Sequence, residues 1–272
     1  MPGYEVVGTV EALGPGVTSP SIGQRVAGLI VHGGYAEKLV RPATAFVPVP
    51  DGLDDATAIA LILNYATAWQ AVHRIAKVQS GDTVLVTGAN GGVGTAMLEI
   101  LRLNGTRTLA AATARSHDLV QSLGATAVES RSAAIDIGVR KLVPGGVDVT
   151  FDNLGGPFVP AAIRSTRKGG LVVGIGFAGT KNDFFAVPLS LGRLFIGAAL
   201  GGRRAKFFGI TQVYRKDPVP FRQDLATLFL LARDGKLKPR IAARLPLLAA
   251  RQAAEMMERG GVEGKIVHLA GT

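Results

Sequence analysis

Three glycines at positions 88, 91 and 94 form the pattern in this sequence with the clearest chemical meaning. Strand-forming residues precede them over 83–87, and apolar residues at helical spacing follow them over 97–101. Glycine lets a backbone turn sharply and approach a ligand, and the N-terminus of the next helix offers free N–H groups. Although the spacing alone also fits a tight turn, this order of strand, turn and helix predicts a dinucleotide-binding loop. The expected cofactor contacts in this loop are Gly88, Asn90, Gly91, Gly92, Val93 and Gly94.

The segment after the next predicted strand, 107–113, indicates which dinucleotide is preferred. A site for NAD usually has an acidic residue there, whereas a site for NADP has none and supplies a cation for the 2′-phosphate. No carboxylate occurs between Glu99 and Asp118, and Arg115 lies in the expected turn. A solvated loop position is the other interpretation of Arg115, but the missing acid itself favours NADP(H). The candidate ligands in this region are Thr113, Arg115 and Arg131.

The composition excludes several other kinds of active site. The chain has 272 residues, no cysteine and four histidines. The lack of cysteine excludes disulfides, thiol catalysis and zinc sites with thiolate ligands. The histidines form neither His-x-His nor His-Glu-x-x-His spacing, and no Gly-x-Ser-x-Gly elbow of a serine hydrolase occurs. We expect no bound metal.

The distribution of apolar residues predicts neither a membrane span nor an export signal. No uninterrupted apolar run reaches the roughly 18 residues of a membrane helix. The most apolar stretch, 56–72, contains Asn64, Tyr65 and Gln70. The first residues also lack the basic and apolar regions of a signal peptide. We therefore expect a cytoplasmic protein.

The formal net charge of +10 arises mostly from one segment. Residues 201–251 contain 12 Lys or Arg against three Asp. A basic stretch can bind nucleic acid, but neither interleaved aromatic residues nor a known binding motif accompanies this one. We interpret the segment as solvated faces that also attract a polyanionic cofactor, and we expect no nucleic-acid partner.

Hydrophobic periodicity predicts an α/β fold with a second, β-rich part. Residues 4–49 are rich in Val, Gly and Pro, which is typical of short strands in a barrel or sandwich. Further along, strands and helices alternate, which predicts a doubly wound parallel sheet of six strands covered on both faces. The expected strands are 6–13, 25–31, 35–40, 83–87, 107–113, 126–129, 147–151, 170–176 and 206–211. The expected helices are 95–104, 116–123, 133–143, 158–167, 221–234 and 249–258, the last between two strands of the tail.

Short motifs that cover nearly the whole chain form a family pattern. They are 2–8 (PGYEVVG), 23–26 (GQRV), 33–37 (GGYAE), 63–68 (LNYATA), 88–94 (GANGGVG), 152–156 (DNLGG), 174–177 (GIGF) and 261–267 (GVEGKIV). With them the chain resembles the medium-chain dehydrogenase/reductase superfamily, in its zinc-independent quinone oxidoreductase branch, which includes zeta-crystallin-like proteins. The resemblance implies a partial GroES-like catalytic lobe at 1–61, an NADP-binding Rossmann domain at 62–211, and a C-terminal return to the lobe at 212–272.

Two departures from that family pattern bear on function. Zinc-dependent relatives carry a histidine ligand where this chain has Tyr4, and they carry cysteines that it lacks. The Pro-Gly-x-Glu motif begins at residue 2, whereas in the family a further segment precedes it and completes the catalytic lobe. We therefore expect one wall of the active site, including a loop over the nicotinamide, to be missing.

Without zinc, hydrogen-bond donors have to stabilise the negative charge that forms on a carbonyl oxygen during hydride transfer. Asn64 and Tyr65, at the entry to the helix that leads into the dinucleotide domain, are the best-placed donors, and a structural role in a hinge is the alternative. Lys265 is expected either at the cofactor phosphates or in a salt bridge to the neighbouring lobe. The other expected cofactor contacts are Thr67, Asn153, Gly155, Ile175, Gly176 and Phe177.

The leading hypothesis is a reductase that transfers a hydride from NADPH to a quinone or an α,β-unsaturated carbonyl. Two alternatives remain open. One is an NADP(H)-binding protein without catalysis, because part of the lobe is missing; the other is a Rossmann methyltransferase, against which Arg115 and the acid-free strand end argue. The resemblance also suggests a homodimer joined through an edge strand at 206–211, near Phe208, because an apolar sheet edge favours pairing with another chain.

Overall fold

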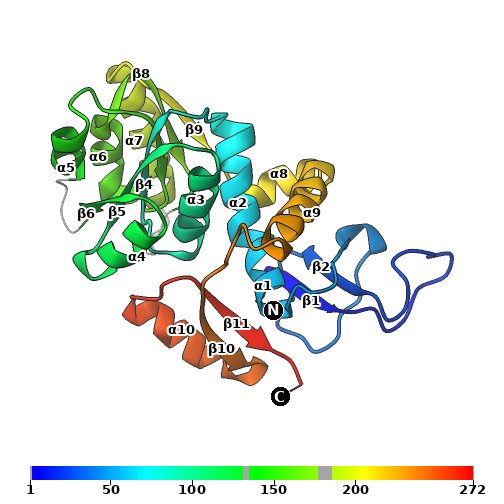
Figure 1. Cartoon of the computed structure of the whole chain (residues 1–272). Coiled ribbons are helices and arrows are strands. Elements are labelled where there is room, and N and C mark those ends of the chain that lie inside the picture. Colours follow the sequence, from blue (N-terminus) through cyan, green and yellow to red (C-terminus); the bar gives the residue numbers. More distant parts are fainter. Residues whose placement is uncertain (1, 131–134, 177–185, 272) are drawn as a thin grey trace. The chain divides into compact units, whose positions relative to one another are not determined.

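A computed structural model describes residues 2–130, 135–176 and 186–271 of the chain (Figure 1). The described residues form two compact units, one of Met1–Thr67 with Ile210–Thr272 and one of Ala68–Gly209. We refer to these as the first and the second unit. Among the described residues, no helix combines the length and the apolarity that crossing a membrane requires.

The second unit contains a six-stranded parallel sheet with the strand order β6-β5-β4-β7-β8-β9. The chain runs outward from β4 to β6 and then crosses back to place β7 beside β4. With right-handed crossovers, this reversal puts helices on both faces and makes the carboxyl ends of β4 and β7 the switch point where ligands bind. The predicted α/β, doubly wound fold is therefore confirmed. The strands are β4 Thr83–Thr87, β5 Arg107–Ala112, β6 Thr126–Glu129, β7 Val147–Asp152, β8 Thr166–Gly174 and β9 Arg204–Phe207.

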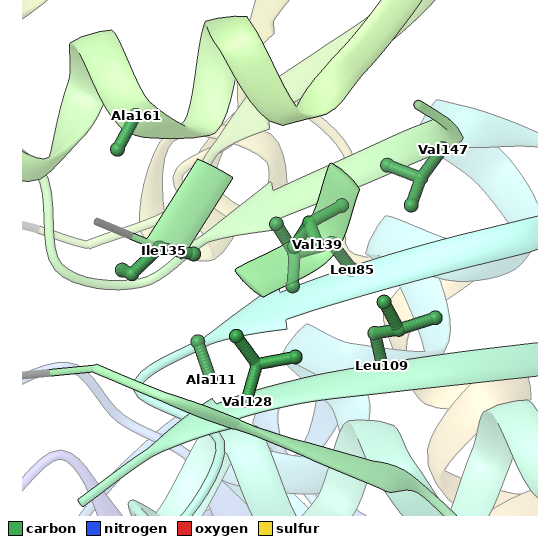
Figure 2. Packing of buried hydrophobic residues seen from close by; sticks show 8 residues of the cluster. All are labelled: Leu85, Leu109, Ala111, Val128, Ile135, Val139, Val147 and Ala161. Carbon is green, nitrogen blue, oxygen red and sulfur yellow. The ribbon is translucent and has the colours of Figure 1, made fainter. Parts of the chain in front are cut away.

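Apolar side chains from both layers hold the helices on this sheet. Figure 2 shows side chains of β4, β5 and β6, such as Leu85, Leu109 and Val128, packed with Ile135 and Val139 of a covering helix. Strands that are buried on both faces need continuous apolar sequences, which explains why the sequence predicts them well. The helices of this unit are α3 Gly92–Leu103, α4 His117–Ser122, α5 Ile135–Leu142, α6 Val159–Ser165 and α7 Ala186–Leu200, with short 3₁₀ turns η4 Ala114–Ser116 and η5 Gly156–Phe158.

The first unit contains a three-stranded antiparallel sheet and a two-stranded parallel one. The strands are β1 Glu5–Thr9, β2 Arg25–Leu29, β3 Val47–Pro48, β10 Ile241–Pro246 and β11 Lys265–Leu269. Its helices are α1 Asp55–Ala60, α8 Ile210–Lys216, α9 Val219–Arg233 and α10 Ala250–Arg259, with 3₁₀ turns η1 Ala43–Ala45 and η6 Leu247–Ala249.

Helix α1 begins where Asp54 caps it. The Asp54 carboxylate accepts hydrogen bonds from the N–H groups of Ala56 (3.0 Å) and Thr57 (3.1 Å), which satisfies two donors that lack a partner within the helix. The helical path continues through a π-turn, η2 Leu61–Tyr65, then α2 Ala66–Trp69 and a second π-turn, η3 Gln70–Ala76.

One predicted strand does not form, and several others have different bounds, such as 6–13, which is β1 Glu5–Thr9, and 170–176, which is β8 Thr166–Gly174. The segment 35–40 is not a strand, because its chain follows a glycine turn anchored by hydrogen bonds from Gly34 N–H to Gly3 O and from Tyr35 N–H to Pro2 O. Val40 there is 91% exposed, so its apolar character has no partner in a sheet. The sixth strand of the large sheet is β9, slightly earlier than predicted. β9 does lie at the edge of the sheet, as expected.

The expectation that Phe208 belongs to that edge strand is wrong. Phe208 follows β9 and is only 2% exposed, and its N–H donates to the carbonyl oxygen of Gly174 (2.9 Å). Ile210, also expected on the strand, begins α8 and is buried.

Candidate functional site

The glycine turn after β4 brings the N-terminus of α3 close to the strand end. Gly88 has a left-handed backbone (φ +59°), and Gly91 is the N-cap of α3. A Cβ atom at Gly94 would lie 2.3 Å from the carbonyl oxygen of Gly88 and 2.7 Å from Ala89, so only glycine fits there. Because N–H groups in the first turn of a helix have no intrahelical partner, this turn offers donors to an anionic group. The geometry fits the pyrophosphate of a dinucleotide.

The turn after β5 lies beside this loop. The side-chain amide of Asn90 donates to the hydroxyl of Ser116 (3.3 Å), which links the two segments. The Thr113 hydroxyl is buried and has no hydrogen-bond partner among the described residues, so a bound polar group could satisfy it. Arg115 is exposed. Arg131 lies outside the described residues.

The loops after β7 and β8 complete the same edge of the sheet. The amide of Asn153 donates to the carbonyl oxygen of Thr87 (2.9 Å), and Gly155 has a left-handed backbone (φ +64°). A Cβ atom at Gly176 would lie 2.7 Å from the carbonyl oxygen of Asn153, and the Ile175 N–H donates to Asp152 O (2.9 Å). Phe177 lies outside the described residues. The structure thus gathers the candidate residues of four strand ends.

Sequence reasoning missed two polar residues beneath these loops. The Asp152 carboxylate, 1% exposed, accepts a hydrogen bond from the hydroxyl of Thr87 (2.7 Å). It also accepts hydrogen bonds from the backbone N–H groups of Leu154 (3.1 Å) and Gly155 (3.2 Å). Burial raises the pKa of Asp152 in spite of these three donors. The signal in the sequence is that Asp152 ends a predicted strand and begins the motif at 152–156.

The candidate catalytic residues belong to the first unit. Asn64 and Tyr65 end the π-turn η2, and both are buried, as is Thr67. π-turns within helices occur frequently at functional sites. Tyr65 already has an interaction partner within the protein.

Lys265 forms an ion pair with Glu5, which joins β11 to β1. Of the two roles expected for Lys265, the structure shows a salt bridge, and its partner lies within the first unit. Burial raises the pKa of Glu5, and the charge of Lys265 opposes that shift. The pair lines a cavity of about 1,560 Å³ along β1. The rings of Tyr35 and His268 also line it and contact each other at a tilt of 58°, with their centroids 4.7 Å apart.

No group of three or more metal-ligating side chains occurs within the parts of the chain that the structure describes.

Two family models match the chain. Residues 1–51 match the alcohol dehydrogenase GroES-like domain, and residues 123–267 match a domain described as zinc-binding dehydrogenase. Among relatives, a quinone oxidoreductase-like protein 2 homolog of Nematostella vectensis is 30% identical over 272 residues, which is 98% of this chain and 72% of that protein.

The chain also matches part of a much longer protein. The phthioceranic/hydroxyphthioceranic acid synthase of Mycobacterium tuberculosis is 30% identical over 270 residues, which cover 97% of this chain but only 12% of the synthase. Two solved structures are similar over 98% of this chain. Mycobacterial Rv1454c complexed with NADPH (28% identity, TM-score 0.85) is covered to 81% of its length, and CurK enoyl reductase (25% identity, TM-score 0.86) to 78%.

Exchanging Gly94 for Ala should lower the free energy of unfolding by about 1–3 kcal/mol, because the new Cβ would overlap the carbonyl oxygen of Gly88. The matched control is Gly192→Ala in α7, where nothing lies within 4 Å of the new Cβ. That variant should gain roughly 0.5–1 kcal/mol, since Ala favours a helix over Gly. Urea unfolding followed by the fluorescence of Trp69, the single tryptophan of the chain, measures both. Equal stability of the two variants would contradict the tight contact.

Proposed function

The chain belongs to the medium-chain dehydrogenase/reductase superfamily, in its quinone oxidoreductase-like branch, and from that premise we propose that it is an NADPH-dependent oxidoreductase. It would transfer a hydride to a quinone or an α,β-unsaturated carbonyl without zinc. The observation that carries this proposal is that two features lie side by side. The glycine turn before α3, which has room only for glycine at position 94, offers N–H donors to an anion, and the segment after β5 contains Arg115 and no carboxylate.

The residues of the second unit fit NADPH, which supplies the hydride when it is bound. N–H groups in the first turn of α3 would bind the pyrophosphate. Arg115 would bind the 2′-phosphate, and the unpartnered hydroxyl of Thr113 would bind a neighbouring polar group. Backbone groups of Ile175 and Gly176, at the carboxyl end of β8, would hold the carboxamide.

We propose that Asn64 and Tyr65 donate hydrogen bonds to the oxygen that gains negative charge. The proposal that the reaction needs no zinc rests on the missing metal ligands. The chain has no cysteine, and Tyr4 stands where zinc-dependent relatives carry a ligand. The names of the relatives support two classes of hydride acceptor. One relative is named quinone oxidoreductase-like, and one solved structure is an enoyl reductase.

The experiment is a turnover assay that follows loss of the nicotinamide absorbance with a panel of quinones, enones and enoyl thioesters. We expect NADPH to be oxidised with at least one of these classes, and elemental analysis of the dialysed protein to show no stoichiometric zinc. About one zinc per chain would contradict the metal-free proposal. Oxidation of NADH and NADPH at equal rates would contradict the assigned cofactor preference.

A second candidate function is binding of NADP(H) without turnover. The observation that favours it is the open cavity along β1, whose lining includes the apolar residues Val6, Phe46 and Ile266. This chain covers 78% and 81% of the two solved structures named above. Binding of NADPH without its oxidation by any member of the panel would favour this second function.

Changing Arg115 to Ala should weaken NADPH binding by roughly tenfold or more, because one charge-assisted contact to a phosphate is worth about 1.5–3 kcal/mol. NADH lacks that phosphate, so its dissociation constant should stay nearly unchanged and serves as the internal control. Fluorescence titration of both cofactors against both proteins provides the measurement. An equal loss for NADH and NADPH would show that Arg115 does not contact the 2′-phosphate.

We also propose that two copies associate through the β9 edge of the sheet. Helix α7 contacts β9 and exposes an apolar surface there that includes Phe195, Ile196 and Leu200. Unpaired strand edges and contiguous apolar patches both favour association. Because Phe208 is buried, a change at that position would test folding and not assembly.

Ile196→Lys should convert a dimer into a monomer, since it places a charge in the proposed interface. The matched control is Ile137→Lys on α5, because Ile137 is 59% exposed and Ile196 is 64% exposed. Light scattering at micromolar concentration gives the molar mass of each. A monomeric unmodified protein would refute the proposed association, and dissociation by both variants would place the interface elsewhere.

A further inference from the structure

Asp152 ends β7 and places a carboxylate beneath the loops of the candidate cofactor site. Its first oxygen, Oδ1, accepts hydrogen bonds from the Thr87 hydroxyl (2.7 Å) and the Leu154 N–H (3.1 Å). The Gly155 N–H lies 3.2 Å from both carboxylate oxygens. The Thr87 hydroxyl in turn accepts a hydrogen bond from the Asn153 N–H (3.2 Å). These bonds join the carboxyl ends of two adjacent strands, β4 and β7.

The segment that this network holds contacts both neighbouring loops. A Cβ atom at Gly88 would lie 3.1 Å from the side chain of Leu154, and one at Gly176 would lie 2.7 Å from the carbonyl oxygen of Asn153. The Gly156 N–H donates to the Ser190 hydroxyl on α7 (2.9 Å). A shift of residues 153–156 would therefore displace the glycine turn after β4 or the turn after β8.

A negative charge at this position does not serve the attraction of an anionic cofactor. Burial raises the pKa of Asp152, whereas the hydrogen bonds that its carboxylate accepts from Thr87, Gly155 and Leu154 oppose that shift. What a carboxylate does provide is acceptors on both oxygens and no donor. An asparagine has one oxygen, and its NH₂ group would face a backbone N–H that is itself a donor.

We propose that Asp152, together with Thr87, is a positioning residue that fixes residues 153–156 in the conformation that NADPH binding requires. The inference rests on the proposed function in one respect, that NADPH is the ligand. Two buried residues that need not touch the cofactor would thereby control the affinity of the site for NADPH.

The test compares the NADPH dissociation constants and melting temperatures of four variants. Asp152→Asn and Thr87→Val should each weaken NADPH binding at least tenfold, and Thr87→Ser, which keeps the hydroxyl, should restore the affinity to within about threefold of the unmodified protein. The matched control is Thr150→Val on the same strand. The Thr150 hydroxyl is buried and pairs with Thr166 (2.8 Å), so its loss should lower the melting temperature and leave the NADPH affinity within twofold.

The direction of the Asp152→Asn effect separates two roles. If the carboxylate acted only through its charge, removing it would tighten binding of the anionic cofactor, and that result would overturn the proposal. Unchanged affinity in both Asp152→Asn and Thr87→Val would overturn it as well. If Asp152→Asn does not fold, the comparison of Thr87→Val with Thr87→Ser decides the question. An unmodified protein that binds no NADPH would refute the proposed function, whereas binding that both variants retain would refute only the positioning role.

Discussion

Close backbone packing at the carboxyl ends of β4, β7 and β8 is the constraint on which the candidate site depends. Gly94 and Gly176 have no room for a Cβ atom, and each would meet a carbonyl oxygen of a neighbouring loop. Glycines in the first turn of α3 lower its helix propensity. The helix nevertheless forms, because side chains further along it, such as Met97, Leu98 and Ile100, are almost fully buried. Tertiary packing along the helix therefore offsets the low helix propensity of its glycine-rich first turn.

Local sequence predicted the elements of the large sheet better than the contacts that organise its site. The strand at 83–87 has the predicted bounds, because a buried parallel strand is a short apolar run between turns. The strand at 126–129 also has the predicted bounds, although it lies at the edge of the sheet and only Val128 in it is buried. The strand predicted at 35–40 is wrong. The composition of this segment is typical of a strand, but no neighbouring strand pairs with it. Thr87 and Asp152 are 65 residues apart, so only the fold brings them together. The roles of the candidate ligands, from Gly88 to Gly176, stay predictions.

The excess of positive charge is partly explained by contacts with backbone carbonyls. Arg203 donates to Thr166 O (3.0 Å), Lys206 to Ile75 O (2.7 Å) and Arg222 to Thr44 O (3.0 Å). Long cationic side chains can satisfy carbonyl groups where strands and helices end, and their apolar stems cover neighbouring surface. These cations thus hold segments within their own units, which accounts for part of the basic segment without a nucleic-acid partner.

Polar residues of the first unit also make structural contacts. Lys265, a candidate phosphate ligand by sequence, is bound to Glu5, and breaking that pair would leave a buried charge without its partner. Burial raises the pKa of Tyr35, and the charge of Glu5 adds to that shift. These groups therefore have structural roles within the first unit. Asn64 and Tyr65 differ from them, because they end a π-turn, which departs from regular helix geometry. The catalytic roles of those two residues stay proposals.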